Sequence, residues 1–161
     1  MAADHVIRIP RLVWLRLVAE LRRRGKGRRE SGAFLLGSTT GDSRVEAFVC
    51  YDDLDPLALS GGMVAFHARG FTALWEHCSS KGLKVLADVH THPTSDVRQS
   101  FVDRDYPMIP VRGHVALILP RYGHTSKWSL DGVGIHVFRG QSQWDSFEHD
   151  QPDTPVRLCT W

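Results

Sequence analysis

Two stretches of the chain place apolar residues three and four positions apart, which is the spacing of one face of an α-helix. The first opens at Pro10, a residue suited to the first turn of a helix, and ends in "RRRGKGRRE", where Gly25 and Gly27 stop it. Its apolar face consists of Trp14, Leu17, Val18 and Leu21. The second ends near Lys81 and Gly82, and its face consists of His67, Phe71, Leu74, Trp75 and Cys78.

Five shorter segments have the patterns of strands. Ser31–Ser38 is a short apolar run between glycines and Arg44–Tyr51 alternates, so we expect a hairpin across "TTGDS". The other three segments are Leu83–His92, His114–Pro120 and Gly132–Gly140. Residues 52–62 are expected to form a loop. The order of helix, two strands, helix and three strands predicts a mixed sheet with helices packed on it, an α/β or α+β fold.

One domain is expected, because 161 residues can bury a sizeable core but are too few for two ordinary domains. Residues 1–140 hold all the predicted elements, and no internal repeat divides them. Residues 141–161 are polar and contain Pro152 and Pro155, so we expect a loose or docked C-terminal extension there.

The composition is that of a globular protein, with 42% hydrophobic and 24% charged residues. A net charge of +2 indicates no nucleic-acid or membrane partner, and no apolar run approaches the roughly 18 residues of a membrane-spanning helix. The start, "MAADHVIRIPRLVW", is not typical of a signal peptide. Three separated cysteines, Cys50, Cys78 and Cys159, form no CxxC pair, which favours a reducing cytoplasm.

The most informative polar residues lie where the third predicted strand ends. His90 and His92 are two positions apart, so on a strand both imidazoles point to one face and can reach one ion. Pro93 ends the strand, and Asp103 lies far enough along for a loop to return it as a third ligand. Two histidines and a carboxylate suit zinc and leave a position for water, as in a catalytic site.

An HxH pair alone is a weak signal, because histidines at strand ends are usually just hydrogen-bonded. Other metal folds with this pair fit poorly. An amidohydrolase barrel needs about 250 residues, and a metallo-β-lactamase needs HxHxDH, whereas Pro93 and Thr94 follow here. A cupin needs a glutamate soon after the second histidine, and none is present. The nearby carboxylates Asp88 and Asp96 are not expected to be ligands.

The wider pattern is more specific. HTHP at residues 90–93, followed by Ser100 and Asp103 (HTHP-x6-S-x2-D), resembles the JAMM motif of the JAB1/MPN/Mov34 metalloproteases position by position. That family also has a glutamate upstream at the start of a glycine-containing strand, where Glu30 stands here in "ESGAFLLGS". The resemblance covers about residues 10–140. It implies a single MPN/JAB-like (cytidine-deaminase-like) domain of the compact prokaryotic type, with a mixed central β-sheet flanked by helices.

The resemblance also implies a role for each matching residue. His90, His92 and Asp103 correspond to the ligands of one Zn2+. Glu30 corresponds to the general base, which takes a proton from the attacking water and passes it to the leaving amine. Ser100 corresponds to the donor that stabilises the developing oxyanion. Ser100 could equally be the N-cap of a short helix that carries Asp103, and the two roles are compatible.

The activity implied is that of an isopeptidase or peptidase that acts on ubiquitin or a ubiquitin-like modifier. The extended, glycine-ended tail of such a modifier fits a narrow slot over the zinc. Residues 44–51 and 52–62 are candidates to pair with the tail by strand addition. Compact prokaryotic members often accompany E1-like and E2-like proteins, some in antiphage defence operons, so we expect such partners.

Alternatives stay open at this point. The same chemistry could act on a sulfur-carrier fusion or a small amide, and a non-catalytic MPN-like scaffold is a third function. The basic run at residues 22–29 could be a solvated helix end favoured by the helix dipole, a rim that attracts an acidic substrate, or a nucleic-acid contact. The remaining histidines that show no ligand spacing are expected on the surface or in the core: His67, His77, His114, His124, His136 and His149.

Overall fold

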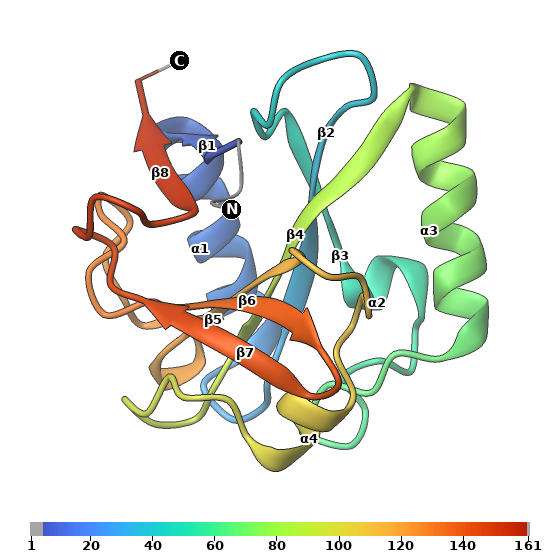
Figure 1. The fold of residues 1–161 in the computed structure, drawn as a ribbon. Coiled ribbons are helices and arrows are strands. Elements are labelled where there is room, and N and C mark those ends of the chain that lie inside the picture. Colours follow the sequence, from blue (N-terminus) through green and yellow to red (C-terminus); the bar gives the residue numbers. More distant parts are fainter. Residues whose placement is uncertain (1–4, 161) are drawn as a thin grey trace.

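The structure, a computed structural model, describes residues 5–160 and contains a six-stranded sheet and a separate pair of strands. The six strands are β2 (Gly32–Ser38), β3 (Ala47–Cys50), β4 (Leu83–Thr91), β5 (Val115–Leu119), β6 (Gly134–Gly140) and β7 (Gln143–Phe147). The separate pair consists of β1 (Ile7–Pro10) and β8 (Val156–Cys159). Figure 1 shows this pair at the upper left, above β5, β6 and β7 of the large sheet.

The large sheet is mixed, as predicted. Its strand order is β3-β2-β4-β5-β6-β7, and only β4 and β5 are parallel to each other among the neighbouring pairs of these strands. The four strand segments 31–38, 83–92, 114–120 and 132–140 are confirmed to within two residues at each end. Antiparallel partners on both sides of the parallel pair place β4, which ends at the HxH pair, near the centre of the sheet.

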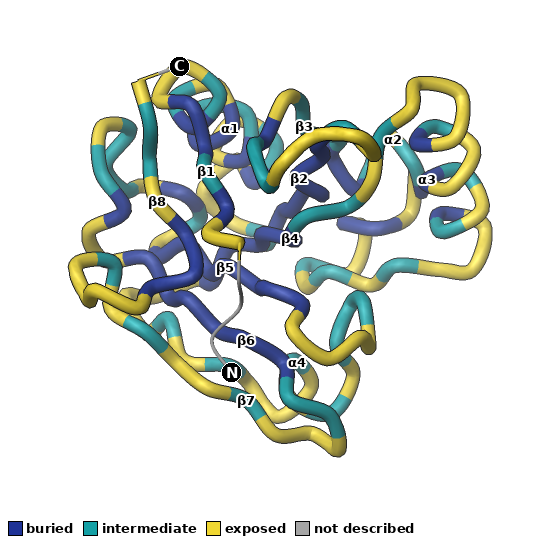
Figure 2. Tube along the Cα trace, turned by 45° about the horizontal axis from the view of Figure 1, so that its top comes forward, coloured by how far each residue is buried: buried dark blue, intermediate teal, exposed yellow. Residues whose placement is uncertain are grey.

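Helices cover both faces of this sheet. The helical segments are α1 (Arg11–Gly25), α2 (Tyr51–Leu54), α3 (Ala68–Lys81), α4 (Phe101–Asp105) and the 3-10 turn η1 (Arg121–Gly123). In β2, Ala33 and Leu35 pack in the core that includes α1, whereas Phe34 and Leu36 pack in the core that includes α3. Burial on both faces explains why the sequence of β2 is an unbroken apolar run. Figure 2 shows that the central strands are the most deeply buried part of the molecule. Within residues 5–160, no helix is long and apolar enough to cross a membrane.

The first predicted helix is confirmed by α1. Pro10 is its N-cap, and all four residues of the predicted apolar face are buried. The helix ends at Gly25, where Lys26 adopts a left-handed conformation (φ 55°) and its N–H donates to the carbonyl of Arg22. A left-handed residue after the last turn is a common helix stop.

The second predicted helix is confirmed by α3, but part of its predicted apolar face is wrong. Leu74 and Cys78 are buried, whereas Trp75 is 50% exposed. His67 precedes the helix as its N-cap and is exposed. The buried stripe of α3 runs through positions four apart, Gly70, Leu74 and Cys78, so Trp75 lies at its edge.

The expected hairpin is present, but its second strand is shorter than predicted. β3 covers only Ala47–Cys50 and pairs antiparallel with β2. The chain then turns into α2, within the stretch expected to be a loop, because the Tyr51 side chain is fully buried against β2. Asp52 and Asp53 lie in the first turn of α2, where carboxylates favour a helix.

The segment after Gln141 differs most from expectation. A loose or docked extension was expected there and no strand was predicted, but β7 joins the edge of the large sheet beside β6, and β8 pairs in parallel with β1. Most residues of β7 are exposed, which explains the polar sequence. β1 itself was not predicted, since its four residues find their partner only at the other end of the chain.

Candidate metal centre

The β4 strand carries the first histidine of the site. Asp88 and His90 point to the same face of the sheet, because side chains alternate along a strand. His92 lies just past the last residue of β4, and its N–H donates to the carbonyl of Leu119 in β5 (2.8 Å), which keeps the chain extended. Both histidines are 9% exposed. The predicted placement of two imidazoles on one face is therefore present.

The end of β4 is joined to the segment that contains Glu30. The N–H of Thr91 donates to the carbonyl of Ser31 (2.9 Å), and the N–H of Ser31 donates to Oγ1 of Thr91 (3.0 Å). Glu30 is held from the other side, since its N–H donates to the carbonyl of Gly62 (2.8 Å) and Oε2 accepts from the N–H of Val64 (3.3 Å). These bonds bring residue 30 to the histidines across sixty positions of sequence.

The short helix α4 supplies the third group. Ser100 is its N-cap, and Oγ accepts from the N–H of Asp103 (3.1 Å). The Asp103 carboxylate in turn accepts from the N–H and the hydroxyl of Ser100, both at 2.8 Å. This reciprocal capping box confirms the N-cap interpretation of Ser100 and fixes the direction of the Asp103 side chain.

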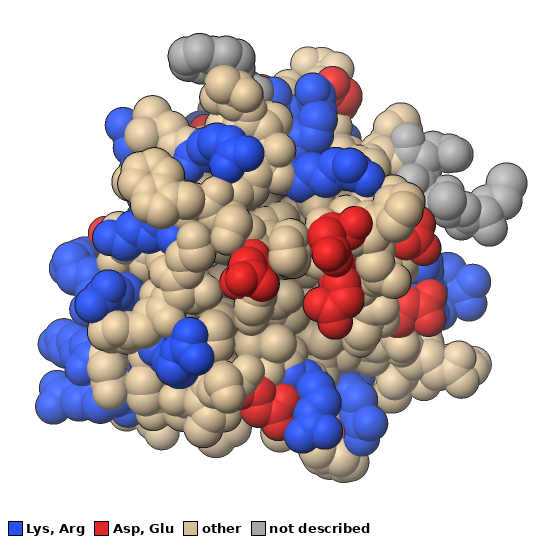
Figure 3. Space-filling model, turned by 90° about the vertical axis from the view of Figure 1, so that its left-hand side faces the viewer, with Lys and Arg blue, Asp and Glu red and all other residues tan. Residues whose placement is uncertain are grey.

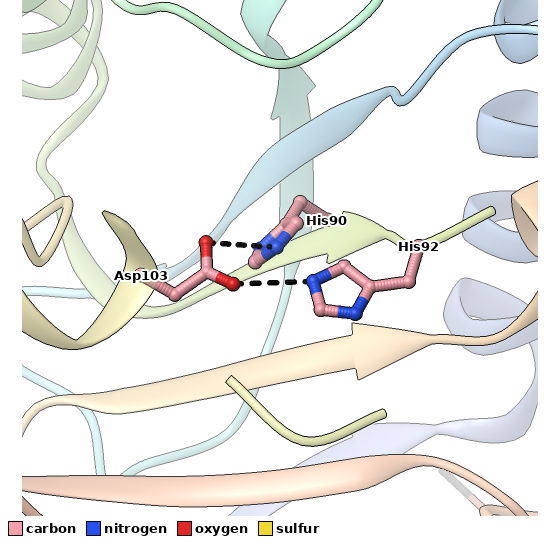
Figure 4. A group of neighbouring side chains, drawn as sticks. All are labelled: His90, His92 and Asp103. Atoms are coloured by element: carbon pink, nitrogen blue, oxygen red, sulfur yellow. Dashed lines mark hydrogen bonds and ion pairs between the residues drawn. The ribbon is translucent and has the colours of Figure 1, made fainter. Parts of the chain in front are cut away.

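The three side chains converge, as Figure 4 shows. Nε2 of His92 lies 3.1 Å from Oδ2 of Asp103, and Nε2 of His90 lies 3.3 Å from Oδ1. One ligand atom from each residue lies within 4.8 Å of those from the other two. Atoms bound to a tetrahedral zinc at about 2.0–2.1 Å stand roughly 3.4 Å apart, so the spacing suits one small ion.

The charges of these groups are strongly coupled. Burial by itself raises the pKa of Asp103, but the contacts with His90 and His92 and the N–H of Ser100 outweigh it and hold that pKa well below the usual carboxyl range. Burial by itself lowers the pKa of His92, yet its bonds to Asp103 and to the carbonyl of Asp96 raise that pKa overall. The Asp103 carboxylate is therefore ionised, which is the form that can bind a metal, and it faces two imidazoles.

Two details of the histidines fit a metal. Nδ1 of His92 lies 2.9 Å from the carbonyl of Asp96, which can only accept, so Nδ1 carries the proton and Nε2 points at Asp103. Nε2 of His90 is buried and has no hydrogen-bond partner within residues 5–160, because its 3.3 Å contact with Asp103 lacks hydrogen-bond geometry. A buried nitrogen without a hydrogen bond is costly unless it binds something else. Two imidazoles and a carboxylate form a donor set that zinc accepts, so the residues present fit this ion.

The centre lies in a cavity of about 820 Å3. The predicted residues that line it are Glu30, His90, His92, Ser100 and Asp103. The structure therefore brings together all five predicted site residues, while their catalytic roles stay predictions. Asp96, one of the two nearby carboxylates that were not expected to be ligands, forms an ion pair with Arg98 (2.7 Å).

The other of these two carboxylates, Asp88, lines the cavity and belongs to a buried network. Its Oδ1 lies 2.6 Å from Nε2 of His114, and its Oδ2 accepts from the hydroxyl of Tyr51 (3.3 Å). His114 is therefore a core histidine, as expected. The contacts account for the polar atoms of Asp88 without a metal, and it lies outside the group that could hold one.

Several residues of the cavity were not identified from the sequence, and two of them matter for the site. His136 on β6 and Trp144 on β7 line it together with the predicted residues. His136 was expected as an ordinary surface or core histidine, and Trp144 lay in the segment expected to be an extension. Burial lowers the pKa of His136, which favours a neutral ring. No local spacing marks either residue, since their strands reach the site only through sheet pairing.

The basic run at residues 22–29 is partly neutralised. Arg24 forms ion pairs with Glu20, Asp52 and Asp53 at 2.8–2.9 Å, and Arg23 also pairs with Glu20. Arg22, Arg23 and Arg24 occupy the last turn of α1, as the helix-dipole interpretation requires. In Figure 3, basic side chains predominate on the left of the face shown, while both signs occur on the right.

Comparison with known proteins concerns the fold. No family model matches the sequence. The chain is similar to the solution structure of a protein from Desulfitobacterium hafniense, with 18% identity and a TM-score of 0.66 over 94% of this chain and 92% of that one. It also matches a JAB1/MPN domain protein from Archaeoglobus fulgidus (15% identity, 98% and 100% covered, TM-score 0.48) and a protein from Salinibacter ruber (19%, 86% and 89%, 0.49). The first similarity shows that this mixed α+β fold occurs elsewhere.

Proposed function

We propose that the protein is a zinc-dependent hydrolase of the JAB1/MPN/Mov34 type, which cleaves a peptide or isopeptide bond. The observation that carries the proposal is the convergence of His90, His92 and Asp103, in which the buried Nε2 of His90 faces the Asp103 carboxylate but makes no hydrogen bond. The match of the same residues to the HTHP-x6-S-x2-D motif supports it. Asp103 and both histidines would hold the ion, in a cavity large enough for a peptide segment.

When bound, zinc supplies Lewis-acid activation of a water and of the scissile carbonyl. Glu30 lines the same cavity and is anchored through its backbone and one carboxylate oxygen. We assign it the proton transfer: it accepts the proton of the attacking water and delivers it to the leaving amine. Ser100 donates to Asp103 in this structure, so an oxyanion role requires its hydroxyl to turn toward the substrate.

The proposed substrate is the C-terminal tail of a ubiquitin-like modifier or its conjugate, with E1-like and E2-like proteins as further partners. Apolar side chains surround the centre, which suits an extended peptide; they include Met63, Val64, Val102, Tyr106 and Met108. β3 is an edge strand and can accept an added strand. Buried thiols at Cys50 and Cys78 suit the reducing cytoplasm that we propose as its location.

Zinc analysis tests the centre first. We expect one zinc per chain, removable by a chelator, and cleavage of a modifier fusion that stops when the metal is removed. Asp103→Asn should weaken zinc binding, because it removes the ligand charge. Glu30→Ala should keep the zinc and abolish cleavage, because Glu30 is proposed to transfer the proton and is not a ligand of the ion. A protein that takes up no metal would sink the proposal.

The substrate class requires a second assay. A panel of modifier fusions, sulfur-carrier fusions and small amides, all tested with the zinc-loaded chain, separates the leading function from hydrolysis of other acyl groups. Retention of biological activity by Glu30→Ala would instead support a non-catalytic scaffold.

A further inference from the structure

The segment that carries Asp103 has little core of its own. α4 contains no buried residue, and Phe101 and Tyr106 are 68% and 74% exposed. Residues 93–96, which follow His92, are held by local hydrogen bonds. The carbonyl of Thr94 accepts from the N–H of Arg121, and the carbonyl of Asp96 accepts from Nδ1 of His92. Residues 97–105 need other contacts to hold Asp103 beside the histidines.

One such contact comes from His136 on β6. Nε2 of its ring lies 2.9 Å from the carbonyl of Val97, and Nδ1 lies 2.8 Å from Oγ of Ser146 on β7. A carbonyl can only accept, so Nε2 carries the proton, while Nδ1 accepts from the serine hydroxyl. Ser146 therefore fixes the ring in the form that binds Val97.

The backbone of β6 is shaped for this contact. A Cβ at position 134 would lie 2.3 Å from the carbonyl oxygen of Val97 and 2.9 Å from Nε2 of His136. Only glycine allows such an approach at this position, so Gly134 lets the loop carbonyl reach the imidazole.

A second contact comes from β7. Nε1 of Trp144 donates to the carbonyl of Arg104 (3.1 Å), which directly follows Asp103. The indole ring packs on Phe138 of β6, with ring centres 5.0 Å apart, so the donor is held in place. The β6–β7 hairpin thus binds the segment on both sides of Ser100 and Asp103, at Val97 and at Arg104.

We propose that His136 and Trp144 are positioning residues of the metal centre, and that the β6–β7 hairpin holds the Asp103 segment in reach of His90 and His92. The inference rests on the metal centre proposed above. The β6–β7 hairpin thereby helps to complete the site. Neither the His136 nor the Trp144 side chain needs to contact the ion for this role.

Zinc affinity of the full chain tests the proposal. Trp144→Phe keeps an aromatic ring on Phe138 but removes the N–H, and His136→Phe removes both bonds of the imidazole. Each variant loses one hydrogen bond to the segment at residues 97–105, so each should weaken zinc binding about fivefold in a chelator competition, the effect of losing one ordinary hydrogen bond. His136→Gln retains an N–H donor and should recover part of the affinity. Trp75→Phe, an exposed tryptophan on α3, is the matched control and should bind zinc like the wild type.

Amide hydrogen exchange of the metal-free chain gives a readout that does not depend on zinc. Both Phe variants should speed exchange at residues 97–106, with the strands of the central sheet unchanged. Unchanged exchange in this segment overturns the proposal, whether or not zinc binds. If the wild-type chain takes up no zinc, the proposed function fails, and faster local exchange alone then still supports the positioning of the segment.

Discussion

Ser100 joins the start of a helix to the ligand set. Its hydroxyl caps α4 and donates to the same carboxylate oxygen of Asp103 that faces His92. At the scale of single residues, the centre therefore depends on groups that do not touch the ion. The Nδ1 proton of His92, fixed by the carbonyl of Asp96, is another.

Ser100→Ala should lower the free energy of unfolding by about 1 kcal/mol, because the cap of α4 is lost. It should also weaken zinc binding, since the Asp103 side chain loses one of the bonds that orient it. Urea unfolding and chelator competition measure the two effects. Ser100→Thr keeps the hydroxyl and should lie near the wild type, and Ser95→Ala, in the same loop, serves as the control. Equal zinc affinity in Ser100→Ala and wild type would contradict this role.

Gly32 shows how closely the strand beside Glu30 is packed. A Cβ there would lie 2.3 Å from Cε2 of Tyr51 and 2.7 Å from the carbonyl oxygen of Val89, and that backbone atom cannot move away. We expect Gly32→Ala to destabilise the fold by about 3 kcal/mol. Gly61→Ala, with nothing within 4 Å of its Cβ, should change stability by less than about 1 kcal/mol. Thermal unfolding of the two variants compares them, and similar melting temperatures would refute the steric argument.

At the scale of elements, Asp55 joins α2 to the start of α3. Its fully buried carboxylate accepts from the N–H groups of Leu57 (3.1 Å) and His67 (2.9 Å), and it pairs with the His67 ring and with Arg69. Burial by itself raises the pKa of Asp55, but the bonds from His67, Leu57 and Arg69 outweigh it, so the pKa lies below the usual carboxyl range.

This depressed pKa predicts how stability depends on pH. An unfolded aspartate titrates near 3.9, so the stabilisation from Asp55 is present above about pH 4 and is lost as pH falls below it. Asp55→Asn should be less stable than wild type at pH 7, and the gap should narrow toward pH 3. Urea unfolding across this range measures the gap, with Asp131→Asn, an exposed acid, as the control. A gap that stays constant with pH would show that ionisation of Asp55 does not matter.

The elements also show what sequence patterns can predict. α1, β2 and β4 were predictable because each buries a periodic or continuous set of apolar residues of its own. β7 was not, because this edge strand exposes most of its side chains. His90, His92 and Asp103 form a local motif, and Glu30 was found through the family pattern. His136 and Trp144 carry no such signal, since their place in the cavity depends on sheet order alone.

At the scale of the whole molecule, the two ends of the described chain meet. β1 leads directly into α1, and β8 pairs with β1 in parallel, with Ile7 opposite Val156 and Ile9 opposite Leu158. Ile9 and Val156 are fully buried in the core that contains α1. The β1–β8 pair lies toward the top of Figure 1, whereas α4, which carries Asp103, lies at the bottom. The strand pair that joins the two ends of the described chain and the metal centre are therefore at opposite ends of the molecule.

That separation predicts that stability and metal binding can be changed independently. Deleting residues 155–161 removes β8 and uncovers the buried face of β1, and it should lower the free energy of unfolding by about 3 kcal/mol or more. Val156→Ala should cost about 2 kcal/mol, and Arg157→Ala, at an exposed position of the same strand, less than about 1 kcal/mol.

Below its unfolding temperature, the truncated chain should bind zinc as tightly as the full chain, because the contacts of His90, His92 and Asp103 lie outside the β1–β8 pair. Calorimetric unfolding and chelator competition on the same samples check both halves. A truncated chain that stays folded but loses zinc would mean that the two ends of the molecule are coupled.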